Sequence, residues 1–186
     1  MCAMFSKPLT PDADLRPLDL SHVQPLWELV EANRERLRQW FAWVDADRSV
    51  EDVAKYVKSA MERHARDEGL TAVIHHQGRA VGAIDFHDWR PLHRYTAIGY
   101  WLAAPAEGKG LMTAAVTAMV DYAFTGRGMN RIEIRCATQN RRSRAVPRRL
   151  GFVEEGVLRQ AELLYDRYND LVVYAMLRDE WVARRT

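Results

Sequence analysis

The hydrophobic period changes along this sequence, and the change limits the folds that the chain can adopt. Apolar residues recur three and four positions apart in 22–41 and again in 50–66, which predicts two amphipathic helices. Between 70 and 103 apolar residues alternate in three runs separated by turn residues, which predicts consecutive antiparallel strands. A helix, a strand, a further helix and a strand follow. This order predicts an α+β fold in which helices flank one mixed, mostly antiparallel central sheet.

Capping residues and breaks locate the ends of these elements. Ser21 is the expected N-cap of the first helix, and Ser49 with Asp52 forms a capping box before the second. Gly151 is expected to end a short helix in "NRRSRAVPRRLGF", while "DLRPL", "RIEIRCAT" and "LVVYAML" are expected as strands. No repeat, low-complexity segment or Gly/Ser linker interrupts residues 1–186, which favours a single domain. The second helix is expected to carry Val50, Val53, Val57, Ala60 and Met61 on one face.

Composition excludes several classes of partner. A formal net charge of +2 gives no reason to expect a polyanionic partner. The arginine-rich segments "RRSRAVPRRL" and "ARRT" contain no aromatic residue on which a base could stack, so no direct nucleic-acid partner is expected. No apolar run approaches the ~18 residues that would span a membrane, and no signal peptide is indicated. Cys2 and Cys136 give no disulfide framework, Cys136 is expected to be buried, and no metal-binding spacing is found. A cytoplasmic setting is therefore expected.

The stretch "EGKGLMTAA" places two glycines directly before an apolar-periodic helix. It is not a Walker loop, because Lys109 is followed by Gly110 rather than by Ser or Thr. It is not a dinucleotide fingerprint, because Thr113 stands in place of the third glycine and the preceding strands are expected to be antiparallel. Gly108 and Gly110 would still let backbone amides at a helix start approach an anion. The alternative is an ordinary strand-to-helix turn without a ligand.

The ordered set "IGYWLAAPAEGKGLMTAA", Asn140 and the following "LGF" resembles the GNAT acetyltransferase family. The pyrophosphate motif of that family is Gln/Arg-x-x-Gly-x-Gly/Ala, on which Glu107, Gly110 and Met112 take the first, fourth and sixth places. A residue other than glycine at the sixth place is typical of the RimJ/RimL-type branch, which acetylates protein N-termini. The resemblance runs from about Leu15 to Trp181 and implies a single-domain GNAT fold with splayed strands at the cofactor cleft.

The resemblance implies that the anion is the diphosphate of coenzyme A (CoA), carried by acetyl-CoA. Glu107 departs from the motif, since a carboxylate there would repel the diphosphate. Binding would then rest on backbone amides, with help from Lys109, while the strand before the turn would pair with the pantetheine arm. The residues implied to contact the cofactor are Trp101, Leu102, Ala103, Gly108, Lys109, Gly110, Leu111, Met112, Thr113, Asn140 and Ser143.

Two residues match catalytic positions of the RimL-type enzymes. Glu162 resembles the general base, and its alternative interpretation is a solvated loop carboxylate. Ser143 resembles the general acid near the thioester sulfur, and its alternative is a helix-start serine that caps backbone N–H groups. Asn140 caps the same helix or touches the pantetheine. Pro147 lies inside that helix and is expected to kink it or end it early, which would shift Ser143.

Substrate contacts are implied for His87, which lies on a predicted strand, and for Tyr168, Asp170 and Trp40. The alternatives are a satisfied, partly buried histidine at 87, a strand-entry turn at Tyr168 and Asp170, and core packing for the aromatic residues near Trp40. His75, His76 and His93 are expected at the hairpin-edge surface.

The favoured hypothesis is transfer of an acetyl group from acetyl-CoA to a primary amine, by direct attack in a ternary complex. On resemblance alone, the favoured acceptor is the N-terminal α-amine of a ribosomal protein. An α-amine has an unperturbed pKa of about 7.7–8.0, so one carboxylate would suffice as base. Members of this branch are often homodimers. The alternatives are an acetyltransferase of a small amine and a non-catalytic module that binds an acyl-CoA or a nucleic acid.

Overall fold

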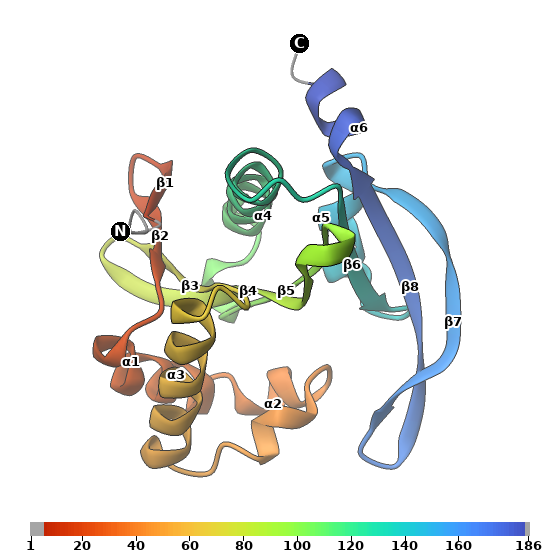
Figure 1. The fold of residues 1–186 in the computed structure, drawn as a ribbon. Helices are drawn as coiled ribbons and strands as arrows, with labels where there is room; N and C mark the ends of the chain where they lie inside the picture. Colours follow the sequence, from red (N-terminus) through yellow and green to blue (C-terminus); the bar gives the residue numbers. More distant parts are fainter. Residues whose placement is uncertain (1–5, 185–186) are drawn as a thin grey trace. The chain divides into compact units, whose positions relative to one another are not determined.

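A computed structural model describes residues 6–184, so Cys2 lies outside the described residues. The chain divides into two compact units. The first holds the residues up to Asp85 together with Tyr100–Ala115, and the second holds Phe86–Gly99 together with the residues from Val116 onward. Within the described residues eight strands form one sheet in the order β1-β2-β3-β4-β5-β6-β8-β7 (Figure 1). The mixed sheet with flanking helices confirms the predicted α+β class.

The strands of the first unit are antiparallel neighbours. They are β1 (Lys7–Thr10), β2 (Ala13–Pro17), β3 (Thr71–His76) and the first part of β4 (Arg79–Arg90). Only β1 was not predicted, because four residues with one apolar side chain carry no alternation. The β3–β4 hairpin turns at Gln77 and Gly78, which have φ of 52° and 75° and lie where turn residues were predicted to separate the first two alternating runs.

The helices of the first unit lie in the segment between β2 and β3. They are the 3-10 turn η1 (Leu20–His22), α1 (Val23–Glu31), α2 (Arg34–Arg38), the 3-10 turn η2 (Ala42–Asp45) and α3 (Val50–Ala65). α1 and α3 pack together (Figure 1), and Leu18, Leu26, Val53, Val57, Ala60 and Val73 form a buried cluster there.

Three predictions for these helices were wrong and one was confirmed. Residues 22–41 form two helices rather than one, because the chain breaks at Asn33 and turns its side chain inward. Ser21 is not the cap: it lies inside η1, which Asp19 caps by accepting the Ser21 N–H at 2.8 Å, and α1 begins directly after His22. Ser49 does cap α3, accepting the Asp52 N–H at 3.2 Å. Met61 is 36% exposed, so the inward face of α3 is narrower than predicted.

The second unit is built on a parallel strand pair and a long antiparallel hairpin. Its strands are the first part of β5 (Tyr95–Leu102), β6 (Arg131–Ala137), β7 (Val153–Leu164) and β8 (Arg167–Leu177), and β7 and β8 form the hairpin (Figure 1). The helix α4 (Leu111–Asp121), whose first residues belong to the first unit, continues into a π-helical turn at Tyr122–Gly126, and α5 (Arg141–Arg149) and α6 (Arg178–Ala183) follow. A short 3-10 turn lies at Pro91–His93, and another, at Ala104–Ala106, belongs to the first unit.

β7 and α6 were not predicted. The register of β7 against β8 shifts twice, and Gly156 and Gln160 have φ of 154° and 51°. The first irregularity adds one residue to β7 and moves the next side chains to the other face, and the second adds two residues, so the sequence of β7 loses the alternation by which a strand is recognised. Glu162 therefore lies in a strand, whereas its alternative interpretation placed it in a loop.

The parallel pairing of β5 and β6 stops part-way along both strands. The registered pairs join Tyr95, Thr96 and Ala97 to Arg131, Ile132 and Glu133. β5 runs on to Leu102 and β6 to Ala137. This early end of the pairing is what the resemblance implies for the cofactor cleft. Of the helices in residues 6–184, none is long and apolar enough to cross a membrane.

A charged cluster fixes the point where the pairing stops. Glu133 is only 8% exposed and accepts hydrogen bonds from Tyr95 Oη at 3.0 Å, Arg131 Nε at 3.1 Å and Arg135 Nε at 3.0 Å. Burial alone would raise the pKa of Glu133, but these donors outweigh burial and lower it. Burial and the Glu133 carboxylate raise the pKa of Tyr95 to about 12. The cluster is therefore held as a carboxylate beside two guanidinium groups.

Glu133→Gln is expected to lower the free energy of unfolding at neutral pH by about 2 kcal/mol, because charge-assisted hydrogen bonds are lost. A depressed carboxyl pKa stabilises the fold above the unfolded pKa, and this contribution disappears as the pH falls through the folded value. The deficit should therefore shrink between about pH 7 and about pH 3 in urea titrations. Glu51→Gln, an exposed carboxylate of α3, is the control. A deficit that does not change with pH would contradict this assignment.

Candidate active site

The glycine turn has the geometry that an anion site needs. Gly108 and Gly110 have φ of 76° and 77°, and a Cβ built on either would meet no atom within 4 Å. The backbone conformation, not packing, therefore requires glycine, and the space beside both α-carbons is open. The Ala114 N–H donates to Gly110 O at 3.0 Å, so the amides just before it belong to the first turn of α4. Such amides and the helix dipole favour a negative charge.

A cation that the sequence did not identify neutralises Glu107. The guanidinium group of Arg36, on α2, forms an ion pair with the Glu107 carboxylate. The same guanidinium donates to the carbonyl of Leu102, at the end of β5. Because Glu107 is paired with Arg36, much of the repulsion expected between its carboxylate and a diphosphate is removed. Arg36 thus ties α2 to both the strand end and the glycine turn.

The end of β5 is held by backbone contacts on two sides. The Ala103 N–H donates to Val81 O at 2.8 Å, and the Ala104 N–H donates to the Asn33 carboxamide at 3.0 Å. A Cβ on Gly82 would lie 2.2 Å from the carbonyl oxygen of Trp101, so only glycine allows this approach of β4 to β5. The predicted cofactor strand, Trp101–Ala103, is therefore rigidly placed beside Gly82.

The aromatic residues after α2 divide into core and site candidates. Phe41 and Trp43 pack against the buried residues Val30, Leu37 and Val44, which confirms the core interpretation for these two. The rings of Trp43 and Trp101 lie 6.1 Å apart. Trp40 is half-buried and remains the predicted substrate contact of this region.

In the second unit, Ser143 lies in the first turn of α5 beside Cys136. Its hydroxyl lies 3.1 Å from Cys136 Sγ, and its N–H donates to the Asn140 side chain at 3.1 Å. Asn140 is therefore the cap, as predicted, and Ser143 is the capped residue. Cys136 is 3% exposed, which confirms its predicted burial.

The expectation that Pro147 ends α5 early was wrong. The helix runs past Pro147 to Arg149 before Gly151 ends it, as predicted, with φ of 76°. Contacts from the middle of the helix compensate for the missing N–H. Arg144 donates to Tyr174 Oη at 3.0 Å and to Thr138 O at 2.8 Å, and the buried ring of Pro147 packs inward. Ser143 is thus held at the start of a continuous helix.

Three predicted site residues share the β7–β8 hairpin. Glu162 is half-buried, and its carboxylate accepts a hydrogen bond from Asn169 Nδ2 at 3.1 Å. Asp170 accepts the Gln160 N–H at 2.7 Å and so holds the irregular turn of β7 in place. Tyr168 is 61% exposed. Tyr168 and Asp170 lie within β8 rather than before it, so the strand-entry interpretation was wrong.

Of the histidines expected at the surface, His93 is exposed but His76 is half-buried and His75 is buried, and the partly buried alternative for His87 was wrong. His87 lies on β4, exposed, and its carbonyl accepts the Thr96 hydroxyl at 3.0 Å. His75 was expected at the surface but is only 7% exposed, because β3 lies between β2 and β4 and His22 packs against its ring at 5.2 Å. Burial lowers the pKa of His75. Residues 6–184 contain no group of three His, Cys, Asp or Glu placed to hold a metal ion.

The geometry therefore contains a helix-start anion site, an interrupted parallel strand pair, and a carboxylate and a hydroxyl on separate elements. These are features that acyl transfer from a phosphorylated carrier would use. The chain belongs to the acetyltransferase (GNAT) domain family, which matches residues 13–153.

Relatives and solved structures agree with this assignment. The chain is 34% identical to the putative ribosomal N-acetyltransferase YdaF of Bacillus subtilis, over 96% of this chain and 98% of that protein. It is 32% identical to the ribosomal-protein-serine acetyltransferase of Escherichia coli, over 89% and 93%. The structure of RimL, a ribosomal L7/L12 α-N-protein acetyltransferase, with coenzyme A superposes with a TM-score of 0.91 at 31% identity, over 95% and 99% of the two chains.

Proposed function

We propose that the chain transfers the acetyl group of acetyl-CoA to the N-terminal α-amine of a protein, by direct attack in a ternary complex. The observation that carries the proposal is the glycine turn, with two positive-φ glycines and open space beside both α-carbons at the start of a helix. The two relatives named for ribosomal acetylation favour a ribosomal-protein acceptor. We further propose one catalytic domain over residues 1–186, acting in the cytoplasm as a homodimer.

The residues of the turn fit the diphosphate of the cofactor. The amides from Gly108 to Thr113 would hold the diphosphate, and the exposed Lys109 would add a cation. The backbone of Trp101–Ala103 would pair with the pantetheine arm, and Asn140 and Ser143 would contact its far end. When bound, acetyl-CoA supplies an acetyl group activated as a thioester.

Glu162 and Ser143 divide the proton transfers between them. The neutral amine attacks the thioester carbonyl, the new C–N bond forms, and the C–S bond breaks. Glu162 accepts the proton that the amine loses, and Asn169 fixes the orientation of its carboxylate. Ser143 donates a proton to the leaving thiolate and recovers one from solvent. His87, Tyr168, Asp170 and Trp40 would hold the acceptor peptide.

Turnover with peptide acceptors tests the proposal. Release of the free thiol from acetyl-CoA is followed with peptides that differ at the first residue, and with spermidine as the small-amine comparison. Turnover with peptides, and loss of turnover when the peptide α-amine is blocked, are expected. Tight binding of coenzyme A without turnover on any amine would instead indicate a non-catalytic module. Faster turnover with spermidine would move the acceptor to the small-amine class.

Arg36→Gln is expected to raise KM for acetyl-CoA by about tenfold and to change kcat little. The variant removes the Arg36 guanidinium from the Glu107 carboxylate and releases the Leu102 carbonyl, so the negative charge beside the turn is less well balanced. Arg38→Gln is the matched control, since Arg38 lies on the same helix and pairs with Asp45 at 2.7 Å, away from the turn. Equal KM values in the two variants would show that Arg36 does not position the turn.

A further inference from the structure

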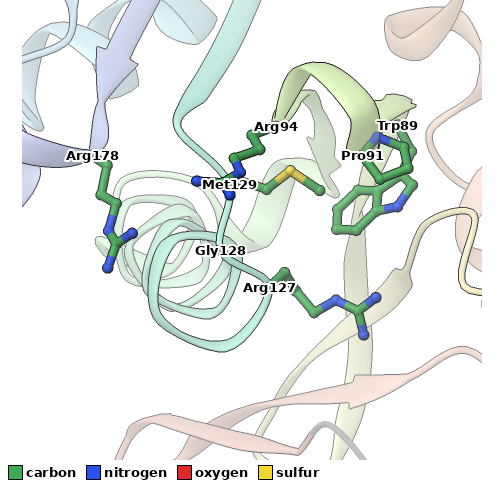
Figure 2. Close-up of a pocket in the computed structure, with 7 residues that line it drawn as sticks. All are labelled: Trp89, Pro91, Arg94, Arg127, Gly128, Met129 and Arg178. Atoms are coloured by element: carbon green, nitrogen blue, oxygen red, sulfur yellow. The ribbon is translucent and has the colours of Figure 1, made fainter.

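A pocket of about 380 Å³ in the second unit brings three arginines and a tryptophan together (Figure 2). None of its residues belongs to the proposed acetyl-transfer site. Its volume falls within the range of small-molecule sites. The residues that matter here are Trp89, Arg94, Arg127, Gly128, Met129 and Arg178, which come from the end of β4, the turn before β5, the loop after α4 and the start of α6.

Backbone hydrogen bonds hold the arginines around this loop. Arg94 O accepts the N–H of Asn130 at 2.6 Å, and the Arg178 N–H donates to Asn130 O at 3.0 Å. Met129 is 2% exposed and donates its N–H to Ala123 O at 3.0 Å. Both flanking arginines are therefore fixed to the loop through their main chains, and Figure 2 shows the three guanidinium groups spread around Gly128.

Within the described part of the chain, two arginines of the pocket, Arg94 and Arg178, are not neutralised in the way that other arginines of this unit are. Arg131 and Arg135 pair with Glu133, and Arg148 pairs with Glu154. No carboxylate in residues 6–184 forms an ion pair with Arg94 or Arg178, and the pocket lining contains no carboxylate. Guanidinium groups in such a setting favour a ligand with phosphate oxygens, which they bind through paired N–H donors.

The indole of Trp89 adds a flat aromatic surface at one side of the pocket. Its ring packs against buried Phe86 at 5.4 Å, and the Arg127 guanidinium lies 5.5 Å from its centroid. Trp89 is half-buried, so part of the indole faces the pocket. An aromatic ring in one pocket with Arg94 and Arg178, which form no ion pair within residues 6–184, is the combination that binds nucleotide bases and phosphates together. The sequence offered no such combination, because Trp89 and its three arginines are separated by up to 89 residues.

We propose that this pocket is a nucleotide-binding site, separate from the site for acetyl-CoA. The phosphate contacts Arg94, Arg127 and Arg178, and the base lies against Trp89. The ligand is a free nucleotide or one nucleotide of a single-stranded RNA. This inference reverses the expectation of no nucleic-acid partner, which rested on the apparent lack of an aromatic residue among arginines.

Binding of a short fluorescein-labelled single-stranded RNA, followed by anisotropy, tests the proposal in the full chain. Saturating coenzyme A fills the cofactor site, so a second nucleotide must bind elsewhere. The double variant Arg94→Gln/Arg178→Gln is expected to weaken RNA binding about tenfold or more. It should also reduce the slope of the logarithm of the binding constant against the logarithm of the salt concentration by about 1.4. These substitutions keep the backbone hydrogen bonds. Arg38→Gln/Arg66→Gln, two carboxylate-paired arginines of the first unit, removes the same charge and should change binding little.

Competition by AMP and by inorganic phosphate defines the ligand. If AMP displaces the RNA at a comparable concentration, the ligand of the pocket is a free nucleotide. If the RNA binds and AMP does not, the ligand is one nucleotide of a single-stranded RNA. Trp89→Leu should weaken binding, and Trp89→Phe should restore most of it. The proposal is overturned if the RNA and AMP both fail to bind in the presence of coenzyme A, if the double arginine variant binds as the wild type does, or if inorganic phosphate competes as well as AMP.

Discussion

Glu162→Gln is expected to lower kcat by about 100-fold near neutral pH, the lower end of what a general base contributes. The substitution preserves the local geometry, since a glutamine oxygen still accepts the hydrogen bond that Asn169 Nδ2 donates at 3.1 Å. Only the ability to take a proton is removed. The loss should be largest at low pH, where little of the acceptor amine is neutral, and smaller above about pH 8, where an α-amine deprotonates unaided.

The pH profile of kcat with one peptide acceptor measures this effect. Glu155→Gln is the matched control. Glu155 lies on the same strand, but its carboxylate pairs with Arg131 and does not face a substrate. The control should keep the wild-type profile. An unchanged kcat in Glu162→Gln at every pH would remove Glu162 from the role of base.

Gly110→Ala is expected to weaken coenzyme A binding by about 10- to 100-fold. The added methyl group has no neighbour within 4 Å in the protein, so it meets the ligand instead. The positive φ of 77° adds strain of about 1–2 kcal/mol for any residue with a Cβ. Calorimetric titration with coenzyme A and urea unfolding separate the two effects.

Gly78→Ala is a control with nearly the same backbone. Gly78 has φ of 75°, and a Cβ there also has nothing within 4 Å, but the residue lies in the β3–β4 turn. Both variants should lose similar stability, and only Gly110→Ala should lose affinity. If affinity falls equally in both, the loss reflects general destabilisation, and the turn does not hold the diphosphate.

Local patterns predicted the elements whose stability is local. The cap of α3 at Ser49, the strands β3 and β4 and the turn at Gly78 follow from spacing and backbone preference within a few residues. The glycine turn also belongs here, since two glycines before an apolar-periodic run indicate a positive-φ turn at a helix start. These features depend on neighbours in the sequence, so the sequence alone could predict them.

Features that depend on distant partners were missed. Arg36 contacts Glu107 across 71 positions, and nothing near either residue indicates the other. His75 is buried because β2 covers β3, which no local pattern reveals. The strand β7 was missed because its register irregularities interrupt the alternation of apolar and polar residues. One of them is held in place by Asp170, on the next strand, which accepts the Gln160 N–H. The roles of Glu162 and Ser143 came from resemblance to a family, and they stay predictions until the variants are measured.

The Arg36–Glu107 pair also constrains how the protein can diverge. Replacing Glu107 by the glutamine of the family motif would leave the half-buried Arg36 guanidinium without its counter-ion. Replacing Arg36 first would leave an acidic group at the mouth of the anion site. Either order passes through an impaired intermediate, so natural variants of this chain should show the two positions covarying.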